Sequence, residues 1–226
     1  MFELSFLGKG AAYFPQYGNT NAWFEYEGDL YCLDCGEEAY GKLARTLDIG
    51  KYTNVYVLLT HLHADHSGSL ASLCSYVYFV LHKKVTIIHP EDKVVTLLEC
   101  QGIKRDQYQL LRELPADKAI KVEFKEVQHA DDMKAYGMIL SSPDEKIYYS
   151  GDAAYLLEEI AMDYLSGKIS RIYHDTSSKE STSHCYYKRL EKQIPVENRK
   201  HVYCMHLDGE YDEMLKESGF SVVEVG

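Results

Sequence analysis

Four side chains able to bind a metal lie within six positions of the segment THLHADHSG, residues 60–68. Imidazole nitrogens and carboxylate oxygens are usual ligands of zinc and its neighbouring divalent metals. His61 and His63 are separated by one residue, so in an extended segment they project to the same side. Asp65 and His66 follow where the chain is expected to turn into a helix. One short loop can therefore present two ligand pairs, one to each of two adjacent metal ions.

Polar side chains also follow several of the predicted strands, at the point where each strand ends. A core histidine or a capping aspartate would explain any one of them, but the repetition predicts one rim where loops converge. These residues are Asp34, His61, His129, Asp152, His174 and His206.

Short β-rich runs alternate with segments of helical spacing along the chain. The predicted strands are residues 3–7, 22–26, 30–34, 54–60, 85–89, 122–127, 137–141, 146–150, 171–174, 201–205 and 221–225. The predicted helices are residues 37–47, 67–81, 91–100, 106–113, 154–166, 183–192 and 210–218. A strand-rich first half carries the THLHADHSG motif, and a second half of strands and helices carries the other candidate ligands.

The chain is large enough to bury a full core, with 226 residues of which 46% are hydrophobic. No long linker rich in Pro, Gly or Ser divides it, so we expect a single domain over residues 1–226. The first ten residues lack the basic region and the long apolar stretch of a signal peptide. The apolar runs are too short to span a membrane. We therefore expect a cytoplasmic protein with no membrane partner.

The formal net charge of −11 bears on the class of substrate. Proteins that bind long nucleic acids usually carry a basic face, because neutralising phosphates supplies much of the affinity. This acidic chain has no long cluster of Lys and Arg. Long nucleic acid is therefore disfavoured as a partner, although a basic patch assembled in three dimensions would change that.

The string HLHADH resembles the signature of the metallo-β-lactamase superfamily, and the rest of that family's pattern follows in order. The segment SFLGKGAAYFPQYGNTNAWFE resembles the family's opening strand and glycine-containing loop, and YCLDCGEEA resembles its second strand. His129 in EVQHADD, Asp152 in YYSGDAA and His206 in YCMHLD stand where the family has its third histidine, its bridging aspartate and its last histidine. The resemblance implies an α/β protein with a four-layer αββα sandwich.

The same resemblance implies a centre of two divalent metal ions, most simply zinc, with manganese or iron as alternatives. Coordination lowers the pKa of a water from about 16 towards 7, which would supply a hydroxide near neutral pH. Asp65 is expected to serve the reaction as well as the metal, and Asp34 either to accept a hydrogen bond from a ligand imidazole or to cap its strand. The implied ligands are His61, His63 and His129 for one ion, Asp65, His66 and His206 for the other, and Asp152 between them.

The stretch RIYHDTSSKESTSH resembles the His-Glu-x-Thr segment of the tRNA 3′-processing endonuclease (RNase Z) branch. Asp replaces Glu here, and the Thr comes one position early. The resemblance implies that His174 lies beside the scissile phosphate and protonates the leaving oxygen, oriented by its neighbour Asp175. The later STSH resembles a rearranged His-Ser-Thr segment of that branch, which makes His184 a second candidate for substrate contact.

A small phosphodiester fits this chain better than a tRNA. The glycine- and proline-rich arm with which that branch holds tRNA is missing between the HLHADH helix and His129. Relatives in the branch include phage enzymes that destroy cyclic pyrimidine nucleotides, so a 3′,5′-cyclic nucleotide is the expected substrate. The opening loop, which faces the metals in this fold, contains Tyr13, Phe14 and Tyr17. We expect one of them to stack on the base and take Tyr17 as the candidate.

Three other functions stay open at this point. The chain could be a tRNA 3′-processing endonuclease, a thioesterase or lactonase on the same fold, or a protein that binds a nucleotide without cleaving it. Only the first of these would share a dependence on His174. Relatives in this branch often dimerise, so a homodimer is among the partners that the resemblance implies.

Overall fold

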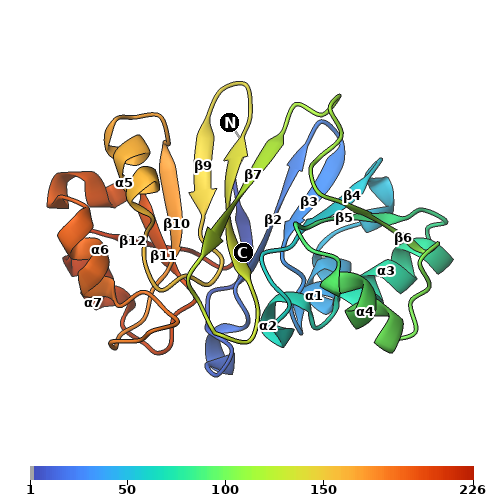
Figure 1. Cartoon of the computed structure of the whole chain (residues 1–226), viewed down its shortest axis with the longest axis horizontal. Coiled ribbons are helices and arrows are strands. Elements are labelled where there is room, and N and C mark those ends of the chain that lie inside the picture. The colour runs from blue at the N-terminus through green and yellow to red at the C-terminus, as the bar shows by residue number, and fades with distance from the viewer. Residues whose placement is uncertain (1–2) are drawn as a thin grey trace.

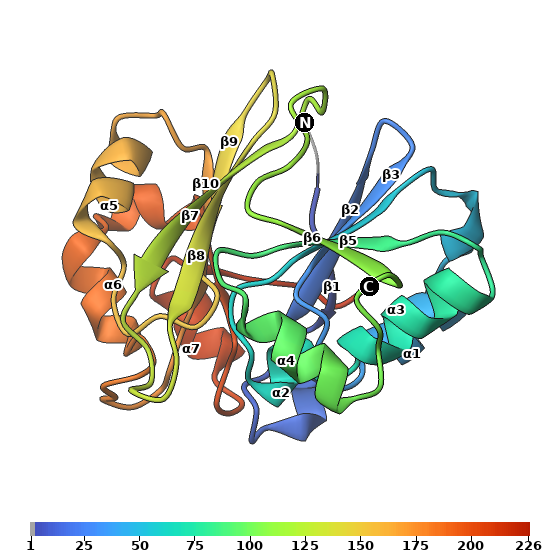
Figure 2. The ribbon, with the colours of Figure 1, turned by 45° about the vertical axis from the view of Figure 1, so that its right-hand side comes forward.

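Two six-stranded β-sheets face each other in the computed structural model, which describes residues 3–226 (Figure 1). The strand order is β1-β2-β3-β4-β5-β6 in the first sheet and β12-β11-β10-β9-β8-β7 in the second. Helices lie on the outer side of each sheet, as the two views show (Figures 1 and 2). The arrangement is the predicted four-layer αββα sandwich.

The first half of the chain forms the first sheet and its helices. The strands are β1 (Ser5–Gly8), β2 (Asn21–Tyr26), β3 (Asp29–Leu33), β4 (Val55–Leu58), β5 (Val85–Ile88) and β6 (Tyr108–Leu111). The helices are η1 (Pro15–Tyr17), α1 (Ala39–Thr46), η2 (Ile49–Lys51), α2 (Ala64–Ser67), α3 (Leu70–Phe79) and α4 (Lys93–Cys100), of which η1 and η2 are 3₁₀ turns.

The second half repeats this plan. The strands are β7 (Lys121–Val127), β8 (Ala135–Ser141), β9 (Lys146–Tyr149), β10 (Arg171–Asp175), β11 (Val202–Met205) and β12 (Ser221–Val222). The helices are α5 (Glu158–Leu165), α6 (Tyr187–Gln193), η3 (Val196–His201) and α7 (Asp212–Glu217). In each sheet the first two strand pairs along the chain are antiparallel, and the later ones are parallel.

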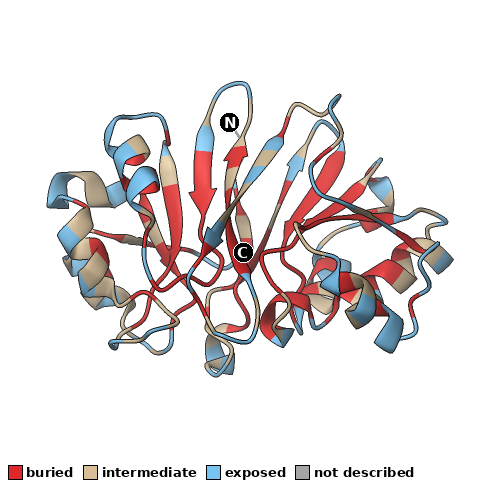
Figure 3. Ribbon diagram, in the orientation of Figure 1, coloured by how far each residue is buried: buried red, intermediate tan, exposed pale blue. Residues whose placement is uncertain are grey.

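The central strands are buried on both faces, as the red strands in Figure 3 show. Strand β3 is the clearest case, since all five of its residues are buried. Because successive side chains of a strand point to opposite faces, Leu30 and Cys32 pack beneath the helices, whereas Tyr31 and Leu33 pack between the sheets. Helices cover the outer-facing side chains of the parallel strands, so these strands are apolar on both faces. This explains the near-continuous apolar runs in the sequence.

One predicted element is wrong in type. Residues 106–113 were expected to form a helix, but they contain strand β6, which pairs in parallel with β5. Tyr108 is buried in the core and Leu110 packs against it, whereas the intervening Gln109 is exposed. This alternation with a period of two is typical of a strand. Within residues 3–226, no helix has the length and apolar character needed to cross a bilayer.

The carboxyl ends of the parallel strands place the candidate site. Strands β3 and β4 end just before Asp34 and the HLHADH segment, and β9 and β11 end just before Asp152 and His206. The carboxyl ends of parallel strands meet at one edge of a sheet, where the connecting loops are free to vary. That edge lies at the bottom of Figure 1, where α2 and the loop between β1 and β2 are seen.

Candidate metal centre

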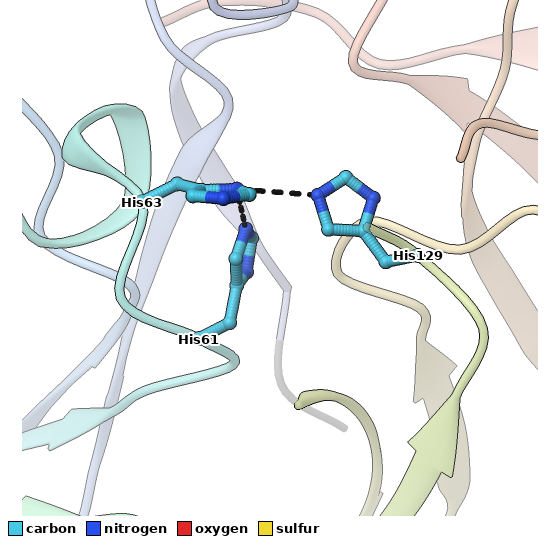
Figure 4. A group of neighbouring side chains, drawn as sticks. All are labelled: His61, His63 and His129. Carbon is cyan, nitrogen blue, oxygen red and sulfur yellow. Dashed lines mark hydrogen bonds between the residues drawn. The ribbon is translucent and has the colours of Figure 1, made fainter. Parts of the chain in front are cut away.

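Three imidazole nitrogens converge at this edge of the sheets (Figure 4). The Nδ1 atom of His63 lies 3.0 Å from Nε2 of His61 and 3.2 Å from Nε2 of His129. His61 and His63 come from the segment after β4, and His129 comes from the turn between β7 and β8. Two halves of the chain thus supply one nitrogen-rich group.

The other nitrogen of each of these rings has a partner that fixes how the ring is turned. His61 Nδ1 lies 3.0 Å from the hydroxyl of Thr60, and His129 Nδ1 lies 2.9 Å from the carbonyl oxygen of Ser183. His63 Nε2 lies 3.1 Å from a carboxylate oxygen of Asp132. Partners of this kind hold ligand imidazoles in the tautomer whose free nitrogen faces a metal. No pattern in the sequence predicted this role for Thr60 or Asp132.

A second, fully buried group lies beside the first. A carboxylate oxygen of Asp65 lies 3.1 Å from His66 Nε2 and 3.2 Å from His206 Nε2. Behind this group, Asp34 contacts His66 Nδ1 at 2.8 Å, which matches one of the two roles that the sequence left open for it, and Asp175 lies 3.5 Å from His206 Nδ1.

Asp152 faces both groups. Its Oδ1 atom lies 3.1 Å from His66 Nε2 and 3.3 Å from His206 Nε2. Its Oδ2 atom lies 3.6 Å from His129 Nε2 and 3.9 Å from His61 Nε2. A carboxylate with one oxygen turned to each group has the geometry of a bridging ligand.

The backbone is strained where it delivers two of these side chains. Asp34, after β3, has a φ of 64°, and His206, after β11, has a φ of 56°. Left-handed backbone at residues other than glycine is uncommon and is concentrated at functional sites. Gly151, with a φ of 56°, lies so close to Thr60 that a Cβ atom there would come within 2.8 Å of its side chain. The last turn before Asp152 therefore requires glycine.

Burial and charge divide the histidines into two kinds. Burial lowers the pKa of His61 and of His129, which keeps both rings neutral. Burial opposes a charge on His206 too, but Asp152 and Asp175 overcome it and raise its pKa to about 10. In the metal-free protein His206 thus carries a proton between ionised carboxylates, and a divalent cation binding there would displace that proton.

The donor atoms fit divalent metal ions. The three nitrogens of His61, His63 and His129 lie within 4.8 Å of one another, and so do the donor atoms of the second group. The buried atoms His66 Nε2 and Asp152 Oδ1 face each other at 3.1 Å without making a hydrogen bond within the described chain. Buried polar atoms nearly always have a hydrogen-bond partner. Convergent nitrogen and oxygen atoms without one are therefore expected where a cation binds.

A histidine–aspartate pair completes the site. His184 Nδ1 lies 2.8 Å from Asp175 Oδ2, and the His184 ring stacks on that of His206 with centroids 5.1 Å apart. Burial opposes a charge on His184, but Asp175 outweighs it and raises the pKa of the imidazole. A cavity of about 590 Å³ joins His184 to the two metal-binding groups, among lining residues that include Tyr13, Glu37 and Ser183.

The structure does not bring His174 to this cavity. Its side chain is wholly inaccessible and its ring packs near Tyr148, with centroids 6.5 Å apart. Along β10, Ile172 packs beneath the helices and Tyr173 between the sheets. His174, two residues after Ile172, therefore faces the helices. The expectation that His174 lies beside the scissile phosphate disagrees with this placement. His184, the second candidate from the sequence, lines the cavity instead.

Tyr17 is also turned away from the cavity. Its hydroxyl donates a hydrogen bond to Asp212 at 3.0 Å, and the Lys9 ammonium lies over its ring at 4.5 Å. It lines a separate surface hollow instead. Tyr13, two residues before η1, is the aromatic side chain of this loop that lines the cavity.

The matching family model is that of the Anti-Pycsar protein Apyc1, which covers residues 2–224. The chain belongs to this family. A similar protein, the Anti-Pycsar protein Apyc1 of Bacillus phage vB_BveM-Goe7, is 24% identical over 96% of this chain and 93% of its own. Together with the two groups of His and Asp side chains described above, membership makes the chain a metal-dependent phosphodiesterase that degrades cyclic nucleotide signals. Of the functions left open by the sequence, the cyclic nucleotide phosphodiesterase is thereby confirmed.

Comparison with solved structures confirms the fold of this chain. The metallo-β-lactamase fold protein YhfI from Bacillus subtilis superposes with a TM-score of 0.78 at 14% identity, covering 100% of this chain and 97% of that one. The short form of human tRNase Z superposes with a TM-score of 0.73 at 18% identity, covering 100% of this chain and 97% of that one. The predicted metallo-β-lactamase fold is therefore correct.

Proposed function

We propose that the chain hydrolyses a 3′,5′-cyclic nucleotide with two divalent ions bound at the groups described above. His61, His63 and His129 would hold one ion. Asp65, His66 and His206 would hold the other, and Asp152 would contact both. The observation that carries the proposal is the convergence of these groups and of the His184–Asp175 pair on one cavity.

Zinc is the metal that this donor set favours. Five imidazoles and two carboxylates form a nitrogen-rich set that suits zinc, with manganese and iron as the alternatives. Bound ions would supply Lewis acidity, which lowers the pKa of a water and neutralises charge on the phosphoryl oxygens.

His184 is the side chain best placed to donate a proton to the leaving oxygen. Asp175 accepts a hydrogen bond from His184 Nδ1, which fixes the ring and favours its protonated form. The remaining nitrogen, Nε2, is then the proton donor. Asp175 also receives the backbone N–H of Ala153 at 3.0 Å, so the carboxylate is itself held in place. A positioned acid of this kind contributes about 10²–10⁴-fold to a rate.

The cavity lining favours a small monoanionic substrate. Its residues within the described chain include the acidic side chains of Glu37 and Asp132 but no lysine or arginine. The phosphate would therefore depend on the ions and on His184 for its binding. A volume of about 590 Å³ lies within the range of small-molecule sites. The homodimer and the cytoplasmic location expected from the sequence stay predictions.

The role of His184 is tested with the metal-loaded protein and two kinds of substrate. For 3′,5′-cyclic nucleotides, whose alkoxide leaving group needs a proton, we expect His184→Ala to lower kcat about 100-fold or more. For bis(p-nitrophenyl) phosphate, whose leaving group departs without a proton, the loss should be much smaller. Products are identified by mass, and metal content is measured in every variant.

Two control variants sharpen this test. His174→Gln replaces a buried residue outside the cavity and should leave the kcat of the folded protein close to wild type. Asp175→Asn is compared at equal metal content, because Asp175 also lies beside His206, and should then show the same selective loss on cyclic nucleotides as His184→Ala. Thermal melting shows whether each variant is folded. Equal losses on both substrates for His184→Ala, or a selective loss on cyclic nucleotides for His174→Gln, would contradict the assignment.

A further inference from the structure

Tyr13 is a fully exposed aromatic residue at the mouth of the metal-binding cavity. Its exposed fraction is 98%, yet it lines the same cavity as His63, Asp65 and His184. Within residues 3–226 it makes no hydrogen bond or ring contact. An aromatic side chain left in water forgoes the stabilisation that burial would give it, so its place at a binding cavity calls for a ligand that covers it.

The backbone that carries Tyr13 is firmly held. The N–H group of Ala11 donates to the carbonyl oxygen of Leu207 at 2.9 Å, and that of Leu207 donates to Lys9 at 2.8 Å. A further N–H group, that of Phe14, donates back to Ala11 at 3.0 Å. Since Leu207 directly follows the metal-facing His206, the loop is tied to the centre itself. The backbone of Tyr13 is thus held in place, while its ring makes no hydrogen bond or ring contact within the described chain that would restrain it.

The two neighbouring aromatic residues are used to build the loop. Phe14 packs edge-on against Tyr17 with ring centroids 4.9 Å apart, and Tyr17 is bound to Asp212 through its hydroxyl. Only Tyr13 among the three turns to the cavity. Ala11 and Ala12, which line the cavity beside it, are too small to screen the ring from a ligand.

We propose that Tyr13 binds the nucleobase of the substrate by stacking on it. The inference rests on the proposed function, because the phosphate of a cyclic nucleotide would lie at the buried ions. The base must then extend from the buried end of the cavity towards its open mouth, where Tyr13 stands. Every base has a π-face, so stacking on an aromatic ring holds any base without reading its identity.

The test separates the base from the rest of the substrate. We compare wild type, Tyr13→Ala and Tyr13→Phe on a 3′,5′-cyclic nucleotide and on methyl riboside 3′,5′-cyclic phosphate, which has no base. Tyr13→Ala should raise KM for the nucleotide about tenfold, or ~1.4 kcal/mol, with little change in kcat. Tyr13→Phe should keep the wild-type KM because it keeps the ring. On the substrate without a base, the three proteins should be alike.

Phe79→Ala is the matched control for Tyr13→Ala, because it also removes an exposed aromatic ring. Phe79 lies at the end of α3, outside the cavity lining. It should behave as wild type on both substrates. A wild-type KM for the nucleotide in Tyr13→Ala, or an equal rise on the substrate without a base, would overturn the inference alone. A metal-loaded wild-type protein that cleaves no cyclic nucleotide would overturn the proposed function and the inference with it.

Discussion

At the scale of single residues, two carboxylates outside the proposed ligand set orient ligand histidines. Asp34 contacts Nδ1 of His66 at 2.8 Å, and its other oxygen accepts hydrogen bonds from the N–H group and hydroxyl of Thr60 at 2.7 and 3.0 Å. Asp175 approaches His206 in a similar way. A carboxylate behind an imidazole fixes the ring and strengthens it as a ligand. Metal affinity should therefore depend on residues that do not touch the metal.

We expect Asp34→Asn to weaken metal binding about 10- to 100-fold. An asparagine keeps the shape but loses the charge that favours the Nδ1–H tautomer of His66. The measurement is the metal content of the protein after dialysis against graded chelator concentrations. Asp92→Asn is the matched control, because the Asp92 side chain is exposed and pairs only with Arg112 among the described contacts. An unchanged chelator midpoint for Asp34→Asn would show that the contact is structural alone.

The sequence could predict which residues converge, but not which way each one faces. His61, His63 and His66 were readable from their spacing, and His129 from its place after a strand. The choice between His174 and His184 was not readable, because four of the five residues of β10 are buried and no polar face marks the side towards the cavity. Only the packing of Ile172 beneath the helices reveals that His174 lies on the same side.

At the scale of elements, strand β6 shows the limit of local patterns. The run around Tyr108–Leu111 is short and mixes apolar with polar residues, so spacing alone does not separate a strand from one turn of helix. Its pairing with β5 decides the matter, and that pairing involves residues more than twenty positions apart. Longer elements such as β7 and α3 were predicted because their patterns extend over more residues.

An ion pair of Lys118 links the connection from β6 to β7, residues 112–120, to the first sheet. Lys118 Nζ lies 2.7 Å from a carboxylate oxygen of the buried Asp29, whose other oxygen accepts the side-chain amide of Asn54 at 2.7 Å. We expect Lys118→Met to lower the free energy of unfolding by about 1–3 kcal/mol, because it leaves a buried carboxylate without its cation. Urea titration measures the change, with the exposed Lys104→Met as control.

The pH dependence of this contribution has a definite sign. The hydrogen bond to Asp29 raises the pKa of Lys118. The stabilisation is therefore complete below the ordinary pKa of lysine and is lost as the pH rises through the raised value. The difference between wild type and Lys118→Met should be full at pH 7 and shrink only in strongly alkaline solution. A difference already absent at pH 7 would show that the pair contributes nothing.

At the scale of the whole molecule, the two halves share one topology and one site. Each sheet begins with antiparallel pairs and continues with parallel ones, and the loops after the parallel strands of both meet at the same edge. The first half supplies His61, His63, Asp65 and His66, and the second supplies His129, Asp152 and His206. The cavity thus forms only where the halves meet, a relation that no local segment of the sequence could show.

The overall charge of −11 predicts how salt affects the reaction. A protein that binds a polyanion through 6–10 phosphates loses about 10³- to 10⁵-fold in affinity between roughly 50 and 200 mM salt. A cyclic nucleotide offers one phosphate, and the cavity lining has no lysine or arginine within the described residues. We therefore expect kcat/KM for the cyclic nucleotide to change only slightly over this range, since screening removes a weak repulsion rather than an attraction. Unprocessed tRNA should cause no mobility shift at either salt concentration. A steep fall of kcat/KM with salt, or binding of the tRNA at low salt, would reveal a basic surface that contributes to substrate binding.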